Sequence, residues 1–553
     1  MRRRLWLSIG MATVGASLLV AAGFASPASS STPQSSAVKQ GGTFNFSKSI
    51  GISYVDPALA YFADEWQFEY VTCAKLMNYP DKPLPAGSRL TPEVAAGLPK
   101  ISNSGKTYTF TIRKGFKYNT GRTITAADFK TAFLRGASGK MNSPAVSYEH
   151  EIVGADDYNA GKASTISGVI AKGNKLIVKL TRIAPDFVSR MTMPFFCPLP
   201  PNTAFDPDGI NDPPGSGPYY IAKYTPDRLI DIKLNKNYHG KRPHRANEIV
   251  YNLSAASLEA CRLQTIQGSV DWCDDGLPPN SYADIAKKYG INRKNGQYYE
   301  NPYTSVGYLA MRTDKGIFAN NIKLRKAVNF AINRPALIAQ GGFHSGAPTD
   351  QILPPTMPGF KNVNAYPLKL NQASLNKAKA LAAGHTRDGK VTMFQGNRGA
   401  RPLRAQVVKA NLAAIGLNVD VNLMSRATQK EREGRKSENF DMTDEGWIAD
   451  YPDPFSFIGA LLQGNSIQET ENVNVSYFNV PKYNKAIQRA GALAGTARYN
   501  AFAKLDVQIT TSNDAVPWAS YQNFIERDFV SKHVGCYVFN PVFQMDLANL
   551  CRK

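Results

Sequence analysis

The segment with the clearest chemical character is Gly446–Pro454, which reads Gly-Trp-Ile-Ala-Asp-Tyr-Pro-Asp-Pro. Each proline restricts its own φ and keeps the preceding residue out of the helical region, so we expect a rigid loop. This loop would hold Trp447, Asp450 and Tyr451 in fixed directions. An aromatic wall beside one carboxylate suits a ligand with a cationic end and an apolar body. A proline-rich turn with a buried tryptophan and a capping aspartate explains the same residues equally well.

The chain offers little for catalysis. Its six histidines are isolated, and no HExxH, GxSxG or phosphate-loop spacing occurs. The cysteines form no CxxC pair and no His/Cys cluster with zinc spacing. We therefore expect no catalytic residues, no metal and no cofactor. A secreted hydrolase whose carboxylates meet only in the fold remains a remote alternative.

Strands and helices alternate around this loop. Residues 108–112 alternate polar and apolar side chains, as a half-buried strand does. Residues 324–332 carry apolar side chains at helical spacing, and 405–415 predict a helix that Gly416 ends before a strand at 417–421. This alternation predicts α/β lobes.

Length and charge restrict the class of protein. A chain of 553 residues exceeds what one core serves, so we expect two or three packed units. The formal net charge is +22, but Lys and Arg are spread along the chain without a long basic run. We expect no nucleic-acid binding. Attraction to anionic cell-wall polymers or phospholipid headgroups, or simply a solvated surface, would account for the charge.

The N-terminus is typical of an export signal. Arg2–Arg4 precede an apolar run with small residues near its end, where cleavage can follow Ala25 or Ala28. This predicts a signal peptide over 1–28 and a flexible tether over 29–42. An uncleaved membrane anchor is the less favoured alternative. No later stretch is long and apolar enough to span a bilayer, so we expect an extracytoplasmic chain, either secreted or held at the cell surface or in the periplasm.

The six cysteines are an even number, which in an exported chain favours disulfides over free thiols. Spacing favours two short loops, Cys261 with Cys273 and Cys536 with Cys551, which leaves Cys73 with Cys197. Six cysteines allow fifteen connectivities, so the other pairings stay open.

From about residue 50 to the C-terminus, ordered sequence blocks carry a family resemblance. The blocks that precede the Gly446–Pro454 segment are Asp56-Pro57, Leu90–Ala95, Lys106–Gly115, Ile124–Phe129, Gly215–Tyr219, Asn235–Tyr238, Gly268–Asp271 and Leu324–Arg334. With these blocks in this order, the chain resembles the solute-binding proteins of peptide-type ABC transporters, the extracytoplasmic family 5 receptors. Relatives in Gram-positive cells often carry a lipid-bearing cysteine after a Leu-Ala-Gly-like box. Here Phe24 follows Ala21-Ala22-Gly23, so there is no lipobox cysteine.

The resemblance implies the domain organisation. It predicts a two-lobed periplasmic-binding-protein-like α/β fold whose lobes are joined by a two-strand hinge. Lobe I would comprise 43–304 and 520–553, with an inserted subdomain at roughly 85–205, and lobe II would comprise 305–519. The ligand would lie in the cleft between the lobes.

The resemblance also implies the binding residues. In peptide-binding relatives, the aspartate that matches Asp450 pairs with the peptide α-ammonium. Trp447 and Tyr451 would form the aromatic wall, and Tyr61 follows the first strand, where family clefts often carry aromatic residues. Lobe core is the alternative for Trp447 and Tyr61, and a turn cap is the alternative for Asp450.

Other residues are expected to serve the scaffold. Asp453 lies between two prolines and would fix the turn. Gly215 and Gly217 would allow a tight approach of the backbone. Arg325 and Arg334 would brace the predicted helix through ion pairs.

The implied function is an extracytoplasmic receptor that captures a solute, most simply a peptide, and delivers it to a membrane ABC permease. We expect a monomer. One alternative is the same fold with an oligosaccharide, a metallophore or a cationic small molecule as its ligand. Another is a basic wall-associated protein, for which the hinge and the ordered blocks would be superfluous.

Overall fold

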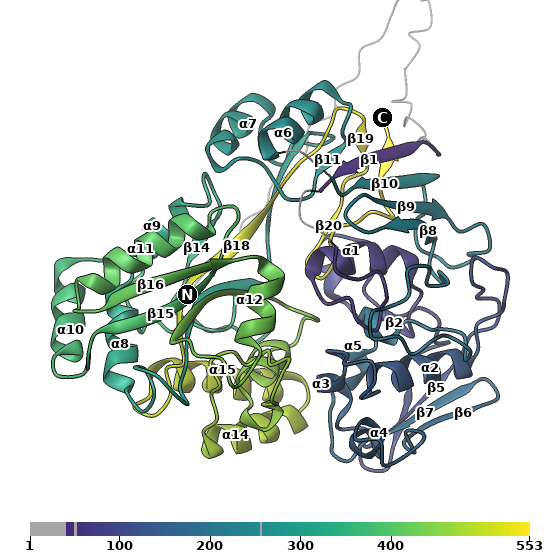
Figure 1. The fold of residues 1–553 in the computed structure, drawn as a ribbon. Helices are drawn as coiled ribbons and strands as arrows, with labels where there is room; N and C mark the ends of the chain where they lie inside the picture. The colour runs from purple at the N-terminus through teal and green to yellow at the C-terminus, as the bar shows by residue number, and fades with distance from the viewer. Residues whose placement is uncertain (1–39, 49–51, 255–256) are drawn as a thin grey trace, which may run out of the picture. The chain divides into compact units, whose positions relative to one another are not determined.

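The computed structural model describes residues 40–48, 52–254 and 257–553. These residues form a mixed α/β fold with two lobes (Figure 1). The first lobe contains a five-stranded and a four-stranded sheet, and the second contains a seven-stranded sheet. The predicted signal peptide and the tether as far as residue 39 lie outside the described residues.

The five-stranded sheet of the first lobe has the order β11-β1-β10-β9-β8. Its strands are β1 (Thr43–Ser47), β8 (Tyr219–Thr225), β9 (Leu229–Leu234), β10 (Glu248–Asn252) and β11 (Trp272–Cys273). Phe44 and Phe46 of β1 are two residues apart and enter one core together with Phe68 of α1 (Ala63–Thr72). Gly217 lies against the end of α1, and a Cβ there would clash with the Val71 carbonyl oxygen, which confirms the predicted close approach.

The four-stranded sheet of the first lobe is antiparallel, with the order β4-β5-β7-β6. Its strands are β4 (Lys100–Ser102), β5 (Thr107–Thr111), β6 (Val169–Lys172) and β7 (Lys175–Lys179). The strand predicted at 108–112 is therefore confirmed as β5. Helix α2 (Ala126–Gly136) packs Phe129 and Phe133 into the core behind the sheet.

The seven-stranded sheet of the second lobe has the order β12-β18-β13-β17-β15-β16, with β14 also paired to β18. Its strands are β12 (Tyr298–Pro302), β13 (Ser305–Met311), β14 (Gly346–Pro348), β15 (Lys390–Gly396), β16 (Asn418–Met424), β17 (Met442–Ile448) and β18 (Trp518–Phe529). The two predicted helices are confirmed as α8 (Ile322–Ala331) and α11 (Arg401–Ala413). Gly416 has φ +84° and precedes β16, as predicted.

Among the described residues, further helices and six two-residue strands accompany these sheets. The remaining helices are α3 (Val146–Glu149), α4 (Ala155–Asn159), α5 (Phe187–Arg190), α6 (Leu258–Gln267), α7 (Tyr282–Tyr289), α9 (Arg334–Ala339), α10 (Gln372–Ala382), α12 (Arg426–Glu433), α13 (Ala460–Leu462), α14 (Pro481–Ala492) and α15 (Gly495–Thr511). The remaining strands are β2 (Met77–Asn78), β3 (Thr91–Pro92), β19 (Val534–Gly535), β20 (Phe539–Asn540), β21 (Gln544–Met545) and β22 (Cys551–Arg552).

The chain passes between the lobes along neighbouring strands. β13 and β18 pair antiparallel, and the rings of Tyr308 and Trp518 stack across them at 3.7 Å. Figure 1 shows β18 as a long strand that runs from the second lobe towards the first. Two adjacent strands of this kind can absorb a rotation of one lobe against the other. The residue boundaries given above for lobes I and II stay a prediction.

The expectation that Arg325 and Arg334 form ion pairs is wrong. Both are buried, and neither forms an ion pair with a described residue. Arg325 donates to the carbonyls of Phe318, Ala515 and Val516, and Arg334 donates to those of Asn329, Thr349, Pro367 and Ser520. Burial lowers the pKa of both side chains to about 10. Arg325 thus ties α8 to the segment before β18, and Arg334 ties α9 to α8, to β18 and to the carbonyls of Thr349 and Pro367.

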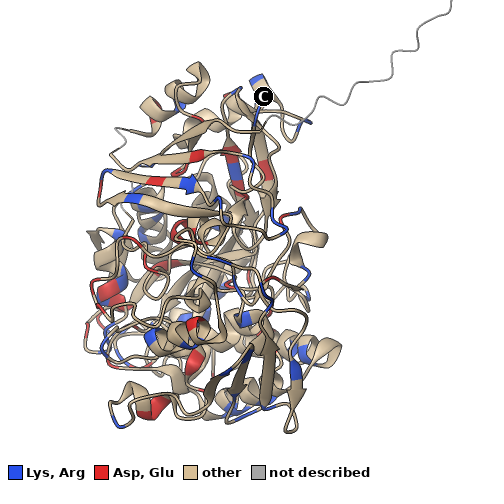
Figure 2. Ribbon diagram, turned by 90° about the vertical axis from the view of Figure 1, so that its right-hand side faces the viewer, with Lys and Arg blue, Asp and Glu red and all other residues tan. Residues whose placement is uncertain are grey.

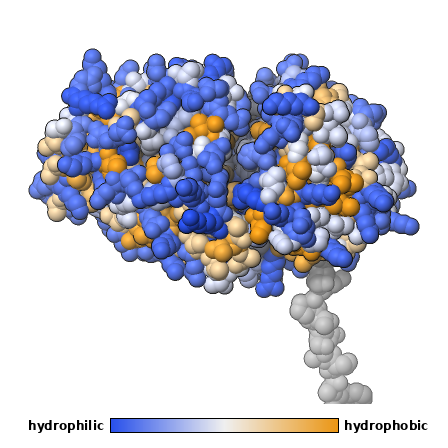
Figure 3. All heavy atoms as spheres, turned by 90° about the horizontal axis from the view of Figure 1, so that it is seen from below, coloured by the Kyte–Doolittle hydropathy of each residue, from blue (hydrophilic) through white to orange (hydrophobic). Residues whose placement is uncertain are grey.

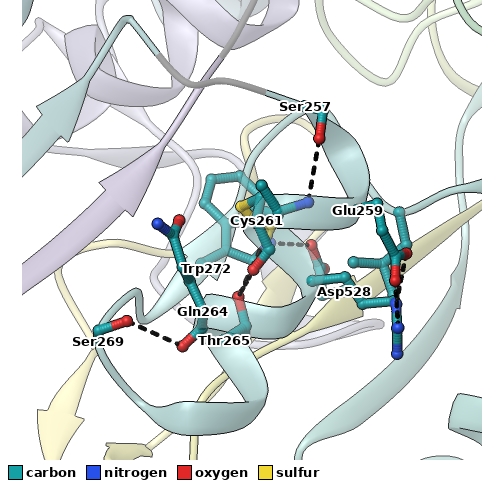
Figure 4. Close-up of a disulfide and its surroundings, with 12 residues drawn as sticks. Ser257, Glu259, Cys261, Gln264, Thr265, Ser269, Trp272 and Asp528 are labelled. Carbon is teal, nitrogen blue, oxygen red and sulfur yellow. Dashed lines mark hydrogen bonds and ion pairs between the residues drawn. A yellow bond between two sulfur atoms is a disulfide. The ribbon is translucent and has the colours of Figure 1, made fainter.

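Three disulfides link Cys73 with Cys197, Cys261 with Cys273, and Cys536 with Cys551, which is the pairing that the spacing favours. Figure 4 shows the second of these, between α6 and β11. The nearby Thr265 hydroxyl donates to the Cys261 carbonyl at 2.9 Å, and the Trp272 indole donates to Asp528 at 3.0 Å. The disulfide therefore joins a helix and a strand that hydrogen bonds already hold in place.

The three disulfides should differ in their contribution to stability. Cys73–Cys197 spans 124 residues, whereas Cys261–Cys273 spans 12. Loop-closure entropy predicts that replacing the long-range pair by serines lowers the free energy of unfolding by about 5 kcal/mol, and the short-range pair by about 3 kcal/mol. Denaturant unfolding of the two double variants measures this difference.

Alkylation of the unfolded, unreduced wild-type protein should label no cysteine, because all six cysteines are in disulfides. Labelled thiols would contradict the presence of three disulfides.

Candidate functional site

A cavity of about 850 Å³ lies between the two lobes and is lined by both. Tyr61 and the start of α1 line it from the first lobe, and Trp447 and Asp450 line it from the second. Figure 3, which views the molecule from below, shows the groove that separates the two halves. Three of the four residues predicted to bind ligand therefore meet at one cavity.

Asp450 is a buried carboxyl without a cationic partner. Its side chain is 6% exposed, and no Lys or Arg of the described residues forms an ion pair with it. The Tyr148 hydroxyl donates to Asp450 Oδ2 at 2.6 Å, and the Tyr61 and Tyr148 hydroxyls are 2.6 Å apart. Burial raises the pKa of Asp450 to about 7, although the two hydroxyls oppose this shift. The carboxyl is thus prepared to accept a cation from the cavity.

The Glu65 carboxylate holds the backbone segment that carries Tyr61. Glu65 accepts the backbone N–H groups of Tyr61 at 2.8 Å and Phe62 at 3.0 Å, and it also accepts those of Ser53 and Tyr54. The Tyr61 ring packs against Phe195 at 5.2 Å, and it lies edge-on to Trp447 at 6.1 Å. Glu65 therefore fixes the loop that carries the aromatic side of the cavity.

Trp447 lines the cavity with its ring, and its indole N–H forms a hydrogen bond outside the cavity. Its indole N–H donates to the Ser456 carbonyl at 2.8 Å, and the side chain is half-buried at the cavity wall. The preceding Gly446 lies close to Phe524, so a larger residue there would crowd the ring of Phe524. The tryptophan can therefore offer apolar surface to a ligand without a loss of hydrogen bonding.

Tyr451, the fourth predicted residue, is not among the described residues that line the cavity. It is fully buried in the core of the first lobe, where its hydroxyl donates to Asp186 at 2.8 Å. The next residues turn tightly, because Asp453 accepts the Phe455 N–H at 2.9 Å, as a turn-fixing aspartate does. Tyr451 thus anchors the loop across the lobes and leaves Asp450 facing the cavity.

Buried ion pairs hold this anchor. Asp186 pairs with Arg190 at 2.9 Å and with Arg498 at 3.2 Å, and Arg498 pairs with Asp453 at 2.8 Å. Burial alone would raise the pKa of Asp186, but Arg190 and Arg498 lower it to about 2. Asp186 is therefore charged at neutral pH, and the ion pairs join α5 of the first lobe to α15 of the second.

On the second lobe, two arginines line the cavity without carboxylate partners. Arg401 and Arg404 form no ion pair with the described residues. Arg401 donates to the Asp444 carbonyl at 3.1 Å, and Arg404 donates to Gln522 at 3.4 Å while its Nε has no acceptor. By contrast, the neighbouring Arg426 and Lys430 both pair with Glu445, each at 2.5 Å, and Lys430 also pairs with Glu433 at 2.9 Å. The Arg401–Arg404 pair can therefore accept an anionic group.

Acidic residues also meet at the first-lobe side of the cavity. Lys48 pairs there with Asp64 at 2.6 Å, with Asp274 at 3.1 Å and with Asp275 at 3.5 Å. One lysine faces three carboxylates, and burial raises the pKa of Asp274 to about 7. The first-lobe wall is thus acidic where the second-lobe wall is basic.

The described residues lack both a metal site and a membrane-spanning helix. They contain no group of three or more His, Cys, Asp or Glu side chains that can hold a metal ion. No helix in this part of the chain combines the length and apolar character needed to cross a membrane.

Sequence reasoning missed Tyr148, Arg401 and Arg404. Tyr148 belongs to none of the sequence blocks, so only the fold brings it to Asp450. The arginines did carry a signal, because they lie one turn apart at the start of α11, and cations at a helix N-terminus are electrostatically unfavourable. Two such residues at the start of a helix indicate that another requirement outweighs helix stability.

The sequence comparisons identify the family. The model of bacterial extracellular solute-binding proteins, family 5, matches residues 89–469, so the chain belongs to this family. It is 25% identical to the periplasmic oligopeptide-binding protein OppA of Salmonella typhimurium over 432 residues, which cover 76% of this chain and 77% of that protein. It is also 25% identical to heme-binding protein A of Haemophilus influenzae over 456 residues, or 80% of each chain.

Solved structures agree on the fold. The clavulanic acid biosynthesis oligopeptide binding protein 2 matches with a TM-score of 0.81 and 22% identity, over 93% of this chain and 96% of that one. The OppA of Haemophilus influenzae in complex with the peptide RPPGFSPFR matches with a TM-score of 0.75 and 20% identity, over 93% and 99%. These matches confirm the predicted two-lobed α/β fold.

The raised pKa of Asp450 predicts a pH dependence of ligand binding. Below pH 7 the ligand-free carboxyl is protonated, and an ammonium ligand must displace that proton. Affinity for such a ligand should therefore fall roughly tenfold for each pH unit below about 7, and it should level off above that value. Calorimetry over about two pH units, from about 5.5 to 7.5, measures how the binding constant changes with pH.

Asp450→Asn is the control for this slope, because Glu65 and Asp274 also line the cavity with pKa values of about 7. The difference between wild type and variant isolates the Asp450 contribution. The free energy of unfolding should change with pH in the direction opposite to ligand affinity, so that it decreases as the pH rises. The folded protein retains a proton that the unfolded chain loses above about pH 4, so the wild type should lose stability relative to the variant between about pH 4 and 7. Equal slopes in both proteins would contradict the assignment.

Proposed function

We propose that this chain is an extracytoplasmic receptor that captures a peptide between its two lobes and delivers it to a membrane ABC importer. The observation that carries the proposal is Asp450, a buried carboxyl at the cavity with hydroxyl partners but no ion pair among the described residues. A buried charge without a partner is unfavourable by several kcal/mol, so the site favours a ligand that brings a cation. The peptide α-ammonium is such a group.

The same cavity also offers positive charge for the carboxylate end of a peptide. Arg401 and Arg404 supply guanidinium groups that form no ion pair with a described carboxylate, and guanidinium pairs well with a carboxylate. A ligand with an ammonium at one end and a carboxylate at the other would satisfy both sites. Trp447 and Tyr61 would then contact the apolar part of the ligand between them.

A second candidate function is the capture of a non-peptide solute by the same site. Relatives with this fold carry names for other ligands, such as heme-binding protein A and a protein solved with agropinic acid. An oligosaccharide would use the aromatic residues but would leave Asp450 and the arginines unpaired. A cationic small molecule or a metallophore would use Asp450 without the arginines. The peptide satisfies all three features and is therefore preferred.

The mechanism is differential binding. Tyr148 and Tyr61 belong to the first lobe and Asp450 to the second, so a ligand at Asp450 reaches both lobes only when they are together. Such a ligand shifts the population towards the closed form, which the permease would recognise. The receptor acts as a monomer in this scheme, and it requires no catalytic group.

The binding proposal predicts a charge-specific loss in Asp450→Asn. The substitution keeps an acceptor for the Tyr148 hydroxyl but removes the charge. For a short peptide with a free N-terminus, affinity should fall by about 30-fold to several thousand-fold, since disabling one partner of a buried charge pair costs about 2–5 kcal/mol. Calorimetry with the best binder from a short-peptide library measures the loss.

The N-acetylated form of the same peptide is the matched control, because it has no ammonium to pair. Its affinity should change little between wild type and Asp450→Asn. Trp447→Ala should weaken both peptides alike, since apolar contact does not depend on the charge. If Asp450→Asn binds the free peptide as tightly as wild type, Asp450 is a turn residue and the ammonium site does not exist.

A further inference from the structure

Half of the net charge of the chain lies in two short segments. Residues 94–127 and 158–185 contain no Asp or Glu and eleven Lys or Arg, against a net charge of +22 for all 553 residues. The segments are separated in sequence, yet the fold joins them, because the first supplies β4 and β5 and the second supplies β6 and β7. The four strands form one antiparallel sheet, which we call the basic sheet.

The strand register gathers lysines on the outer face of the basic sheet. Leu176 and Val178 of β7 are buried towards α2, so Lys175 and Lys179 point outwards and are exposed. Lys172 pairs with Lys175 across the β6–β7 turn, and Lys100 lies opposite Thr109 on β5. The remaining outward positions carry Thr, Ser or Ile and no carboxylate.

Most of these cations have no internal counter-charge. Arg122 pairs with Asp128 and Arg182 pairs with Glu151. No ion pair with a described residue is formed by any lysine of the two segments: Lys100, Lys106, Lys114, Lys117, Lys162, Lys172, Lys175 and Lys179. Figure 2 shows this side of the molecule, with blue Lys and Arg positions on the strands at its lower end. Such a face attracts anions from a distance.

Exposed aliphatic side chains lie at the margin of the basic sheet. Leu98, two residues before β4, is 69% exposed, more than any other large hydrophobic residue described. Ile101 of β4 is 52% exposed, and Val153 and Ile183 are 37% and 36% exposed. Val153 is joined to the sheet, because its N–H donates to the Lys179 carbonyl at 2.9 Å. Ile101 pairs with the buried Tyr108 and so lies at the open edge of the inner face, whereas Val153, bonded to Lys179, adds exposed aliphatic surface beside the unpaired lysines.

We propose that the basic sheet docks on the surface of an anionic phospholipid bilayer. Lysines near such a surface are attracted to its headgroups, and aliphatic side chains beside them can enter the headgroup–acyl boundary. A soluble polyanion would use the lysines but would leave Leu98 and Val153 in water, which favours the bilayer. This docking would keep the receptor beside the membrane whether or not the cavity holds a ligand.

Sedimentation with lipid vesicles tests the proposal on the full chain. Wild type should bind vesicles of phosphatidylglycerol mixed with phosphatidylcholine, and it should bind vesicles of phosphatidylcholine alone far more weakly. Binding should decrease steeply at about 1 M salt, where the screening length is about 3 Å. Equal binding to both kinds of vesicle would overturn the proposal. So would retention on immobilised polyphosphate without vesicle binding, which would assign the sheet to a soluble polyanion.

A triple variant assigns the binding to the sheet. Lys172→Gln, Lys175→Gln and Lys179→Gln together should weaken vesicle binding on the order of 100-fold, since each lysine at an anionic surface contributes roughly five-fold. Lys379→Gln, Lys409→Gln and Lys504→Gln form the matched control, because these lysines are also exposed but lie on α10, α11 and α15 of the second lobe. The control should change binding less than about three-fold, because those lysines lie on second-lobe helices and outside the basic sheet, and salt screens charges that do not touch the lipid surface.

Two further variants keep the test decisive. Leu98→Ser with Val153→Ser should weaken vesicle binding without a change in charge, which a purely electrostatic contact would not show. Lys100→Gln with Lys162→Gln, outside β7, repeats the charge test if the triple variant folds poorly. Peptide affinity should be unchanged in all of them, so the cavity and the sheet are tested separately. Equal losses in the sheet variant and the second-lobe control would overturn the assignment.

Discussion

The geometry of the cavity depends on the buried ion pairs that hold the Gly446–Pro454 loop across the lobes. Asp186 lies on the first lobe, and Arg498 and Asp453 lie on the second, and all three are buried. Removing one partner of a buried pair costs about 3–5 kcal/mol, because the remaining charge stays in a medium that solvates it poorly. Tyr451 joins this network through Asp186, so Asp450, its neighbour, has little freedom to turn away from the cavity.

The buried charges of this network are paired, whereas the buried charges at the cavity form no ion pair with a described residue. In the network every charge has a partner within 3.2 Å. At the cavity, Asp450 has only hydroxyl donors, and Arg401 and Arg404 have only neutral acceptors. The same chain therefore neutralises buried charge where the fold requires it and leaves charge uncompensated at one place. Uncompensated buried charge reduces stability, and ligand binding is the interaction that would offset this loss.

The sequence predicted local features well and cross-lobe contacts poorly. Periodicity located β5, α8 and α11, because the pattern of apolar residues depends only on neighbours along the chain. The proline-rich loop was recognised, but the direction of Tyr451 was not, since adjacent residues of a turn can face opposite sides. Arg325 was assigned an ion pair because charge is visible in sequence, whereas the carbonyls of Ala515 and Val516 that it binds become its neighbours only through the fold. Tyr148 has no sequence signal for the same reason.

In the proposed function, the position of Asp450, more than its charge, would couple binding to closure. A ligand shifts a conformational equilibrium only by the difference between its affinities for the two forms. Arg401 and Arg404 both open α11 of the second lobe, so a ligand that contacted only these arginines would bind open and closed forms alike. At Asp450 the ligand instead contacts a second-lobe carboxyl whose hydroxyl partners, Tyr148 and Tyr61, come from the first lobe. In the proposed function, the Arg401–Arg404 subsite would therefore add affinity and selectivity, while the ammonium subsite at Asp450 would supply the difference in affinity that closes the lobes.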